Sequence, residues 1–117
     1  MVVFSVNPLL AHEMTPTYPE LKASYISGVV TTKMRLFNRR SDVEYYEISV
    51  YDADWELIPF ATENRILKID YLQTTYFDIY IRSLDIGKVK YICTLSKLKK
   101  DSSVTTAISS RICSKIK

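Results

Sequence analysis

Apolar and polar residues alternate with a period of two through much of this sequence. In residues 29–37, "VVTTKMRLF", every second residue from Val30 to Leu36 falls on one face, and the residues between them fall on the other. A helix would not gather these residues on one face, so the pattern predicts a half-buried strand. The polar segment 38–42 then supplies turn-forming Asn, Ser and Asp, and alternation resumes in residues 43–51, "VEYYEISVY". The two runs predict a strand pair with a polar connection.

Three later segments repeat the alternation. They are residues 74–83, "TTYFDIYIRS", residues 88–98, "KVKYICTLSKL", and residues 104–117, "VTTAISSRICSKIK". Their β-branched and aromatic residues are typical of strands. Residues 14–25, "MTPTYPELKASY", contain two prolines and predict an extended or irregular connection rather than a helix. About six to eight short strands at near-regular spacing predict an antiparallel β-sandwich.

Length and charge add a few limits. A chain of 117 residues is long enough for one domain with one core, so we interpret residues 1–117 as a single domain. No segment approaches the roughly 18 consecutive apolar residues that a membrane span needs, and the first residues lack the pattern of a signal peptide. The net charge of +3 comes from 16 basic and 13 acidic residues that are mixed along the chain. The sequence thus predicts a soluble domain without a strong preference for polyanions.

The basic excess does collect near the end of the chain. A possible basic patch consists of Lys97, Lys99, Lys100 and Arg111. A nucleic acid or an anionic surface could dock on such a patch, but a solvated hairpin tip explains the same residues. We therefore do not expect a nucleic-acid partner.

Candidate catalytic and metal-binding residues are few. His12 is the one histidine of the chain, and we interpret it as a surface side chain because no cysteine lies near it in the sequence. Asp52, Asp54 and Glu56 are spaced like metal or acid–base ligands, but they lack the glycine and the distal glutamate of a calcium loop, so a solvent-facing turn is favoured. No nucleophile, P-loop or zinc-protease motif is present. The sequence predicts no enzyme, no cofactor, no metal site and no small-molecule substrate.

The two cysteines suggest a strand register. Cys93 and Cys113 lie at equal distances from residue 103, so a hairpin centred there would place them opposite each other. A disulfide would close a loop of about 20 residues and contribute about 3 kcal/mol, mainly by restricting the unfolded chain. Two free, partly buried thiols are an equally good interpretation, because directly opposed strand positions often give poor disulfide geometry.

The order of segments resembles that of a known family. The segments that carry the resemblance span nearly the whole chain and read "FSVNP", "MRLFNRRSDVEYYEISVYDADWELIPF", "RILKID", "TTYFDIYIRS", "KVKYICTLSKL" and "AISSRICSKIK". Together they resemble the amino-terminal immunoglobulin-like domain of PapD-like periplasmic pilus chaperones. The resemblance implies an all-β, immunoglobulin-like antiparallel β-sandwich of about seven strands. It also implies a periplasmic location, with the cytoplasm or a virion as alternatives.

The resemblance further implies a binding mechanism. Pilus chaperones lend alternating apolar residues of their last strand to an unfinished subunit, which is a form of strand addition. In this chain the corresponding strand edge is Val104, Thr106, Ile108 and Ile112. The same residues could instead fill the domain's own core. The basic residues with which the family anchors its subunit have no counterpart, since "NPLLAHEM" contains no Arg or Lys and Cys113 follows the "RI" of the last strand.

Two functions follow from these observations. The first is a non-enzymatic protein-binding module that resembles a pilus assembly chaperone and pairs a strand edge with another polypeptide. The alternative is a structural or accessory immunoglobulin-like subunit of a pilus, secretion apparatus or virion. Such a subunit would self-associate or dock through a tyrosine-rich face, for which the candidates are Tyr45, Tyr51, Tyr76 and Tyr80.

Overall fold

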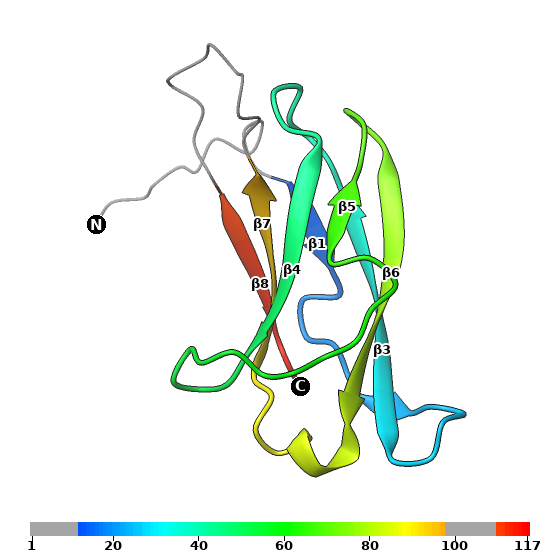
Figure 1. Cartoon of the computed structure of the whole chain (residues 1–117). Coiled ribbons are helices and arrows are strands. Elements are labelled where there is room, and N and C mark those ends of the chain that lie inside the picture. Colours follow the sequence, from blue (N-terminus) through cyan, green and yellow to red (C-terminus); the bar gives the residue numbers. More distant parts are fainter. Residues whose placement is uncertain (1–11, 98–109) are drawn as a thin grey trace.

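The computed structural model describes residues 12–97 and 110–117, and these form a two-layered β-sandwich (Figure 1). The strands are β1 (Glu13–Thr15), β2 (Lys22–Ala23), β3 (Val29–Phe37), β4 (Tyr45–Tyr51), β5 (Ile66–Lys68), β6 (Thr74–Arg82), β7 (Tyr91–Lys97) and β8 (Arg111–Lys115). A short 3-10 helix, η2 (Ser83–Asp85), follows β6. No α-helix occurs in these residues. The predicted all-β antiparallel sandwich is confirmed.

Every strand pairs antiparallel with its neighbours in one of two sheets. In the first sheet β3 is central: β6 pairs along one side of it, while β1 and β2 share the other side. The second sheet has the order β5, β4, β7, β8. The chain changes layer between β3 and β4, between β5 and β6, and between β6 and β7. Such crossings between two sheets are typical of immunoglobulin-like sandwiches.

The predicted pairing of β3 with β4 is wrong, although both strands are present. The two strands lie in different sheets, and the connection from residue 38 to residue 44 crosses the end of the sandwich between them. The physical reason is that each strand has one apolar face. Placed in opposite layers, the two faces meet in one core about 10 Å thick, whereas a hairpin would leave both on one sheet.

The predicted faces of three strands are confirmed. Alternate residues of β3, β4 and β6 are buried, and the residues between them are partly or fully exposed. The inward residues of these strands are Val30, Thr32, Met34, Leu36, Tyr46, Ile48, Val50, Phe77, Ile79 and Ile81. Period-two alternation therefore identified the core correctly wherever one face was clearly apolar.

Strand β7 turns polar side chains inward. Ile92, Thr94 and Ser96 face the interior with exposed fractions of 0%, 0% and 1%, while Tyr91 and Leu95 lie on the outer side and are only partly buried. Buried hydroxyl groups need hydrogen-bond partners, so the interior beside the end of β7 must be polar.

The segment after β1 connects the two sheets. Beyond Thr15 the chain leaves the first sheet, and the carbonyls of Thr17 and Pro19 accept hydrogen bonds from Lys115 and Lys117 at 3.1 and 2.9 Å. Residues 17–19 thus run along the end of β8 and the residues that follow it, as expected for an extended connection. This contact covers part of the outer edge of the second sheet.

Candidate functional site

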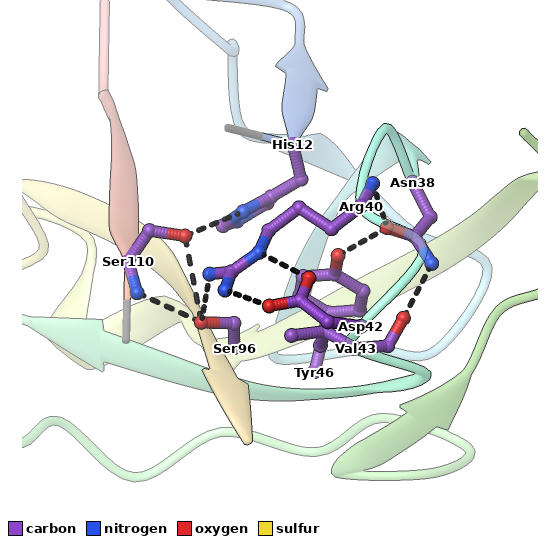
Figure 2. A network of polar contacts seen from close by, with 8 residues as sticks. All are labelled: His12, Asn38, Arg40, Asp42, Val43, Tyr46, Ser96 and Ser110. Atoms are coloured by element: carbon purple, nitrogen blue, oxygen red, sulfur yellow. Dashed lines mark hydrogen bonds and ion pairs between the residues drawn. The ribbon is translucent and has the colours of Figure 1, made fainter. Parts of the chain in front are cut away.

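A buried polar cluster fills the end of the sandwich where β3 passes to β4 (Figure 2). It draws residues from the start of β1, the β3–β4 connection, β4, β7 and the start of β8. Its members are His12, Asn38, Arg40, Asp42, Tyr46, Thr94, Ser96 and Ser110. The cluster brings together segments that are up to 98 residues apart in the sequence.

Asn38 fixes the course of the β3–β4 connection. Its amide nitrogen donates to the carbonyls of Val43 and Ile69, both at 2.8 Å. Its side-chain oxygen accepts the backbone N–H of Arg40 at 2.8 Å and also the hydroxyl of Tyr46. These bonds use both donors and the acceptor of a side chain that is wholly buried. Burial raises the pKa of Tyr46 to about 12, so its hydroxyl stays protonated and continues to donate.

Arg40 is a buried cation with a carboxylate partner. Its side chain is 3% exposed, and its Nε and Nη2 donate to the two oxygens of Asp42 at 3.0 and 2.7 Å. Nη1 donates more weakly to Ser96 Oγ at 3.4 Å. The hydrogen bond from Arg40 holds the pKa of Asp42 below its usual value. This bidentate geometry fixes the plane of the guanidinium inside the sandwich.

His12 is buried, with 2% exposure, so the prediction of a surface histidine is wrong. The reason is its position just before β1: His12 and Met14 share the inward face of that short strand. Its Nε2 lies 2.9 Å from Thr94 Oγ1, and its Nδ1 lies 3.3 Å from Ser110 Oγ. The ring thereby links the start of the described chain to β7 and to the residue before β8.

The environment of His12 keeps its ring neutral. Burial lowers the pKa of His12 from 6.5 to about 4, and the positive charge of Arg40 acts in the same direction. Although Ser110 and His12 have the residue types of a nucleophile and a base, the second ring nitrogen faces a hydroxyl rather than a carboxylate. A shielded base with such a low pKa is poorly suited to proton transfer at neutral pH. The geometry instead fits a structural clamp between β1, β7 and β8.

A disulfide joins β7 to β8 beside this cluster. Cys93 and Cys113 are direct partners in the strand register and are bonded to each other, with their Cα atoms 4.0 Å apart. The hairpin register is the one that the midpoint at residue 103 predicts. Neither cysteine of the chain is a free thiol. The disulfide therefore fixes the position of β8 along its neighbour.

The residues proposed from sequence for the strand edge are only partly within the described chain. Ile112 packs against the hydrophobic core and is half-buried, as the core-filling alternative requires. Val104, Thr106 and Ile108 lie outside the described residues. The backbone of β8, however, forms the edge of the second sheet, so the edge position itself is observed.

The proposed basic patch also lies partly outside the described residues, since Lys99 and Lys100 are not among them. Lys97 pairs with Glu47, with Nζ 3.2 Å from Oε1. The guanidinium of Arg111 lies over the ring of Trp55, 5.3 Å from its centroid. Both described cations thus have partners on this domain, which leaves less positive charge for a polyanion.

An aromatic cluster on the outer side of the second sheet was not anticipated from the sequence. The ring of Trp55 stacks on Tyr91 with centroids 4.1 Å apart and planes 7° apart, and it lies 5.7 Å from Tyr51. Trp55 sits in a turn with a positive φ of 62° and stays 46% exposed. The side-chain direction of a turn residue has no periodic signal, so only the presence of a tryptophan pointed to this place.

The four tyrosines proposed as one face do not form one. Tyr45 and Tyr51 lie on the outer side of β4, while Tyr76 and Tyr80 lie on the outer side of β6. These strands belong to opposite layers, so the tyrosines split into two pairs on opposite surfaces of the sandwich. Sequence alternation could not show this, because it does not say which layer a strand joins.

The carboxylates after β4 form a turn. One side-chain oxygen of Asp52 accepts the backbone N–H groups of Asp54 and Glu56 at 2.8 and 2.9 Å, which is the solvent-facing turn that the sequence favours. Residues 12–97 and 110–117 contain no group of three or more potential metal ligands. No helix in the described parts of the chain could cross a membrane.

Comparison with known proteins gives no neighbour: no family model, no curated protein and no solved structure matches this chain.

Proposed function

We propose that this protein is a non-enzymatic protein-binding module in which the edge of β8 pairs with an extended segment of another polypeptide. The observation that carries the proposal is that the backbone groups of Arg111 and Cys113 point away from β7 and have no partner within the described residues. An edge strand with unpaired N–H and C=O groups is a template for an added strand.

The direction of these groups follows from the strand pairing. The carbonyl of Ser110 and the N–H of Ile116 are bonded on the β7 side, at 2.9 and 2.8 Å. Backbone groups alternate sides along an antiparallel strand, so Arg111, Cys113 and Lys115 direct theirs outward. Lys115 bears this out, because its N–H donates to residue 17 on the outer side. Among the described residues, the outward backbone groups of Arg111 and Cys113 remain without a partner, while Lys115 at the end of β8 is covered by residue 17.

The edge is firmly attached to the rest of the domain. The disulfide holds β8 to β7 at its centre, and the hydrogen bond between Ser110 and His12 ties its start to β1. A preformed and fixed strand loses little conformational entropy when a partner strand is added. The disulfide also fits an oxidising compartment, which supports a periplasmic location. The likeness to pilus chaperones supports the same function, with Val104, Thr106 and Ile108 as the side chains of the binding strand, whereas Ile112 packs against this domain's own core.

The test uses backbone chemistry at Arg111. Proline in place of Arg111 removes the outward N–H but no bond to β7, because edge positions that face solvent tolerate proline. We compare Arg111→Pro with the matched variant Arg111→Thr, which also loses the guanidinium but keeps the N–H. Each is purified from the native host with its bound proteins, after thermal unfolding has shown that both are folded.

We expect Arg111→Thr to recover as much of the bound polypeptide as the wild type does. Arg111→Pro should recover at least about tenfold less, which corresponds to a loss of about 1.4 kcal/mol of binding free energy. Equal recovery with both variants would contradict pairing at the β8 edge. Equal loss with both would assign the binding to the arginine side chain instead.

The alternative function, a structural or accessory subunit, is favoured by the exposed aromatic cluster. Trp55 is 46% exposed and Leu57 beside it is 70% exposed, which is typical of contact surfaces. This function predicts self-association that Trp55→Ser weakens and Tyr18→Ser, a control at an exposed aromatic residue elsewhere, does not. Sedimentation velocity over a range of concentrations measures it.

A further inference from the structure

We propose that the free edge of β6, in the first sheet, is a second and separate strand-pairing site that takes an extended peptide with a basic side chain. This site lies on the opposite side of the sandwich from β8 (Figure 1) and does not depend on the function proposed for β8. Its three elements are unpaired backbone groups, a small cleft beside them and an unpaired carboxylate at the rim of the cleft.

Along part of its outer edge, the backbone of β6 has no partner in the part of the chain that the structure describes. Tyr80 exchanges two backbone hydrogen bonds of 2.9 Å with Ala61 on the side away from β3. The backbone N–H and C=O groups of the even-numbered residues of β6 therefore point away from β3. Beyond this bridge the chain leaves the edge. The backbone groups of Thr74 and Tyr76 and the N–H of Asp78 then have no partner within the described residues, while the carbonyl of Asp78 accepts a side-chain hydroxyl at 2.8 Å.

The sequence of this edge contains one charged residue, Asp78, but lacks the other common protections. Proteins commonly block edge strands with lysine, proline or a bulge. Residues 74–78, "TTYFD", contain neither lysine nor proline, and their pairing with β3 continues without a bulge from Thr74 to Arg82. The exposed ring of Tyr76, at 62%, adds a side chain that favours cross-strand contacts. An open, regular edge of this kind is suited to accept a strand.

A cleft of about 230 Å³ lies against this edge. Its walls come from β6 on one side and from residues 62–64 on the other, with the buried side chains of Leu67 and Phe77 among its lining. This volume is below the roughly 300–1,000 Å³ of small-molecule sites. It is suited to one side chain of an added strand, directed inward at the position beside Phe77.

The charge of the cleft selects the partner. Glu63 is exposed, lines the cleft and has no ionic partner among the described residues, and Asp78 also lines it, with Lys33 3.6 Å away on the outer face. A lysine or arginine on the incoming strand would meet this negative charge. A second copy of β6 would not, because residues 74–81 contain no basic residue. The charge therefore favours a basic peptide over pairing of two β6 strands.

The test uses the full chain, labelled with ¹⁵N, and the capped octapeptide TVTKTVTV as the probe. Amide exchange should slow at least tenfold at Tyr76 and Asp78 on binding and stay unchanged at Arg111 and Cys113. Tyr76→Pro, which removes an outward N–H, should weaken binding at least tenfold. The matched variant Tyr76→Thr should stay within threefold of the wild type, and Glu63→Gln should abolish the preference for this peptide over TVTQTVTV.

Altered peptides keep the test independent of the variants' folding. Two versions of the probe carry N-methyl groups on alternate amides, one at the odd-numbered positions and the other at the even-numbered positions. Only the version whose methyl groups face β6 should lose binding. Equal binding of both versions, or no binding of the unmodified peptide, would overturn the proposal. Protection at Arg111 and Cys113 alone would also overturn it and would leave the β8 proposal standing. Amide exchange at Tyr76 could also slow with rising protein concentration when no peptide is present. That result would overturn the proposal of a basic peptide and would assign the edge to a second copy of the chain.

Discussion

At the end of the sandwich where β3 passes to β4, the interior holds a histidine, an arginine and three hydroxyl-bearing strand residues, whereas at the opposite end it holds aliphatic side chains. The first end contains His12, Arg40 and Tyr46, and the second contains Val30, Ile81 and Val89, all within one continuous sandwich. A buried carboxylate at the second end, Asp85, is paired locally with Arg82, three residues away. Within residues 12–97 and 110–117, buried ionisable groups join distant strands at the polar end and not at the aliphatic end.

This difference separates two kinds of stability. Aliphatic packing depends on volume and apolar area and changes little with pH. A buried polar cluster depends on the direction of each hydrogen bond and on protonation, and in return it admits few alternative arrangements. The polar end is where the chain crosses between layers and where β1 and β8 are attached, so specific contacts lie where the topology needs them.

The largest effect is expected at the aliphatic end. Ile81→Ala removes a side chain that is 1% exposed and leaves a cavity, so the free energy of unfolding should fall by about 4 kcal/mol. Because no titrating group is removed, the loss should be the same at pH 7 and pH 5. Urea unfolding measures both values. The control is Ile86→Ala at a residue that is 46% exposed, and a comparable loss there would contradict the argument from burial.

The stability that the polar end contributes should depend on pH through the titration of His12. Its pKa is about 4 in the folded protein against 6.5 as the ordinary value. Between these two values the unfolded chain binds more protons, so stability is full above pH 6.5 and is lost as the pH falls. By pH 4 the loss should reach about 3 kcal/mol from this residue alone.

The variant His12→Gln isolates this contribution from that of the carboxylates. Glutamine can keep a hydrogen bond to Thr94 but cannot titrate, so the difference in unfolding free energy between variant and wild type should change by about 3 kcal/mol between pH 7 and pH 4. Parallel pH profiles for the two proteins would show that His12 titrates normally in the folded state.

Sequence patterns predicted the aliphatic end well and the polar end poorly. Strict alternation in β3 and β6 placed Val30 and Ile81 on apolar faces, and both are buried, because a run of alternating apolar side chains by itself indicates which face is buried. His12 carries no such preference, and a single histidine beside an acidic residue reads as exposed. Its burial depends on Thr94 and Ser110, which are brought to it only by the fold.

The connection between β3 and β4 shows the same limit. Asn38, Ser41 and Asp42 predicted a turn, which is present, but its polar residues did not show that the chain crosses to the other sheet. The opposite charges of Arg40 and Asp42, two residues apart, were the available signal for an ion pair. Burial of that pair could not be inferred, since buried arginine is rare and depends on its complete surroundings. The register of the cysteines was predictable because it follows from hairpin symmetry alone.

The ion pair at the polar end should show a smaller effect than either change above. Asp42→Ala leaves the buried guanidinium of Arg40 without this carboxylate and should cost about 2 kcal/mol, below the ~3–5 kcal/mol of fully buried pairs because Asp42 is 38% exposed. Chemical denaturation at pH 7 measures it. Adding Arg40→Met should recover part of the loss, since the buried charge that has lost the Asp42 carboxylate is then removed. If the double variant lost as much stability as Asp42→Ala and Arg40→Met lose separately, added together, the two residues would not be coupled.

The smallest effect is expected at Tyr46. Tyr46→Phe removes the hydroxyl that donates to Asn38, but the acceptor oxygen keeps its bond to the Arg40 backbone, so the loss should be about 1 kcal/mol. The neighbouring variant Tyr45→Phe is the control, because that residue is 38% exposed and lies on the outer face. In the wild type, the raised pKa of about 12 means that Tyr46 contributes stability below pH 10 that is lost as the pH rises towards 12, and ultraviolet absorbance at alkaline pH follows its ionisation. Equal stability of the two variants would show that the buried hydroxyl adds nothing beyond the packing of its ring, and the polar end would then depend on the arginine and histidine alone.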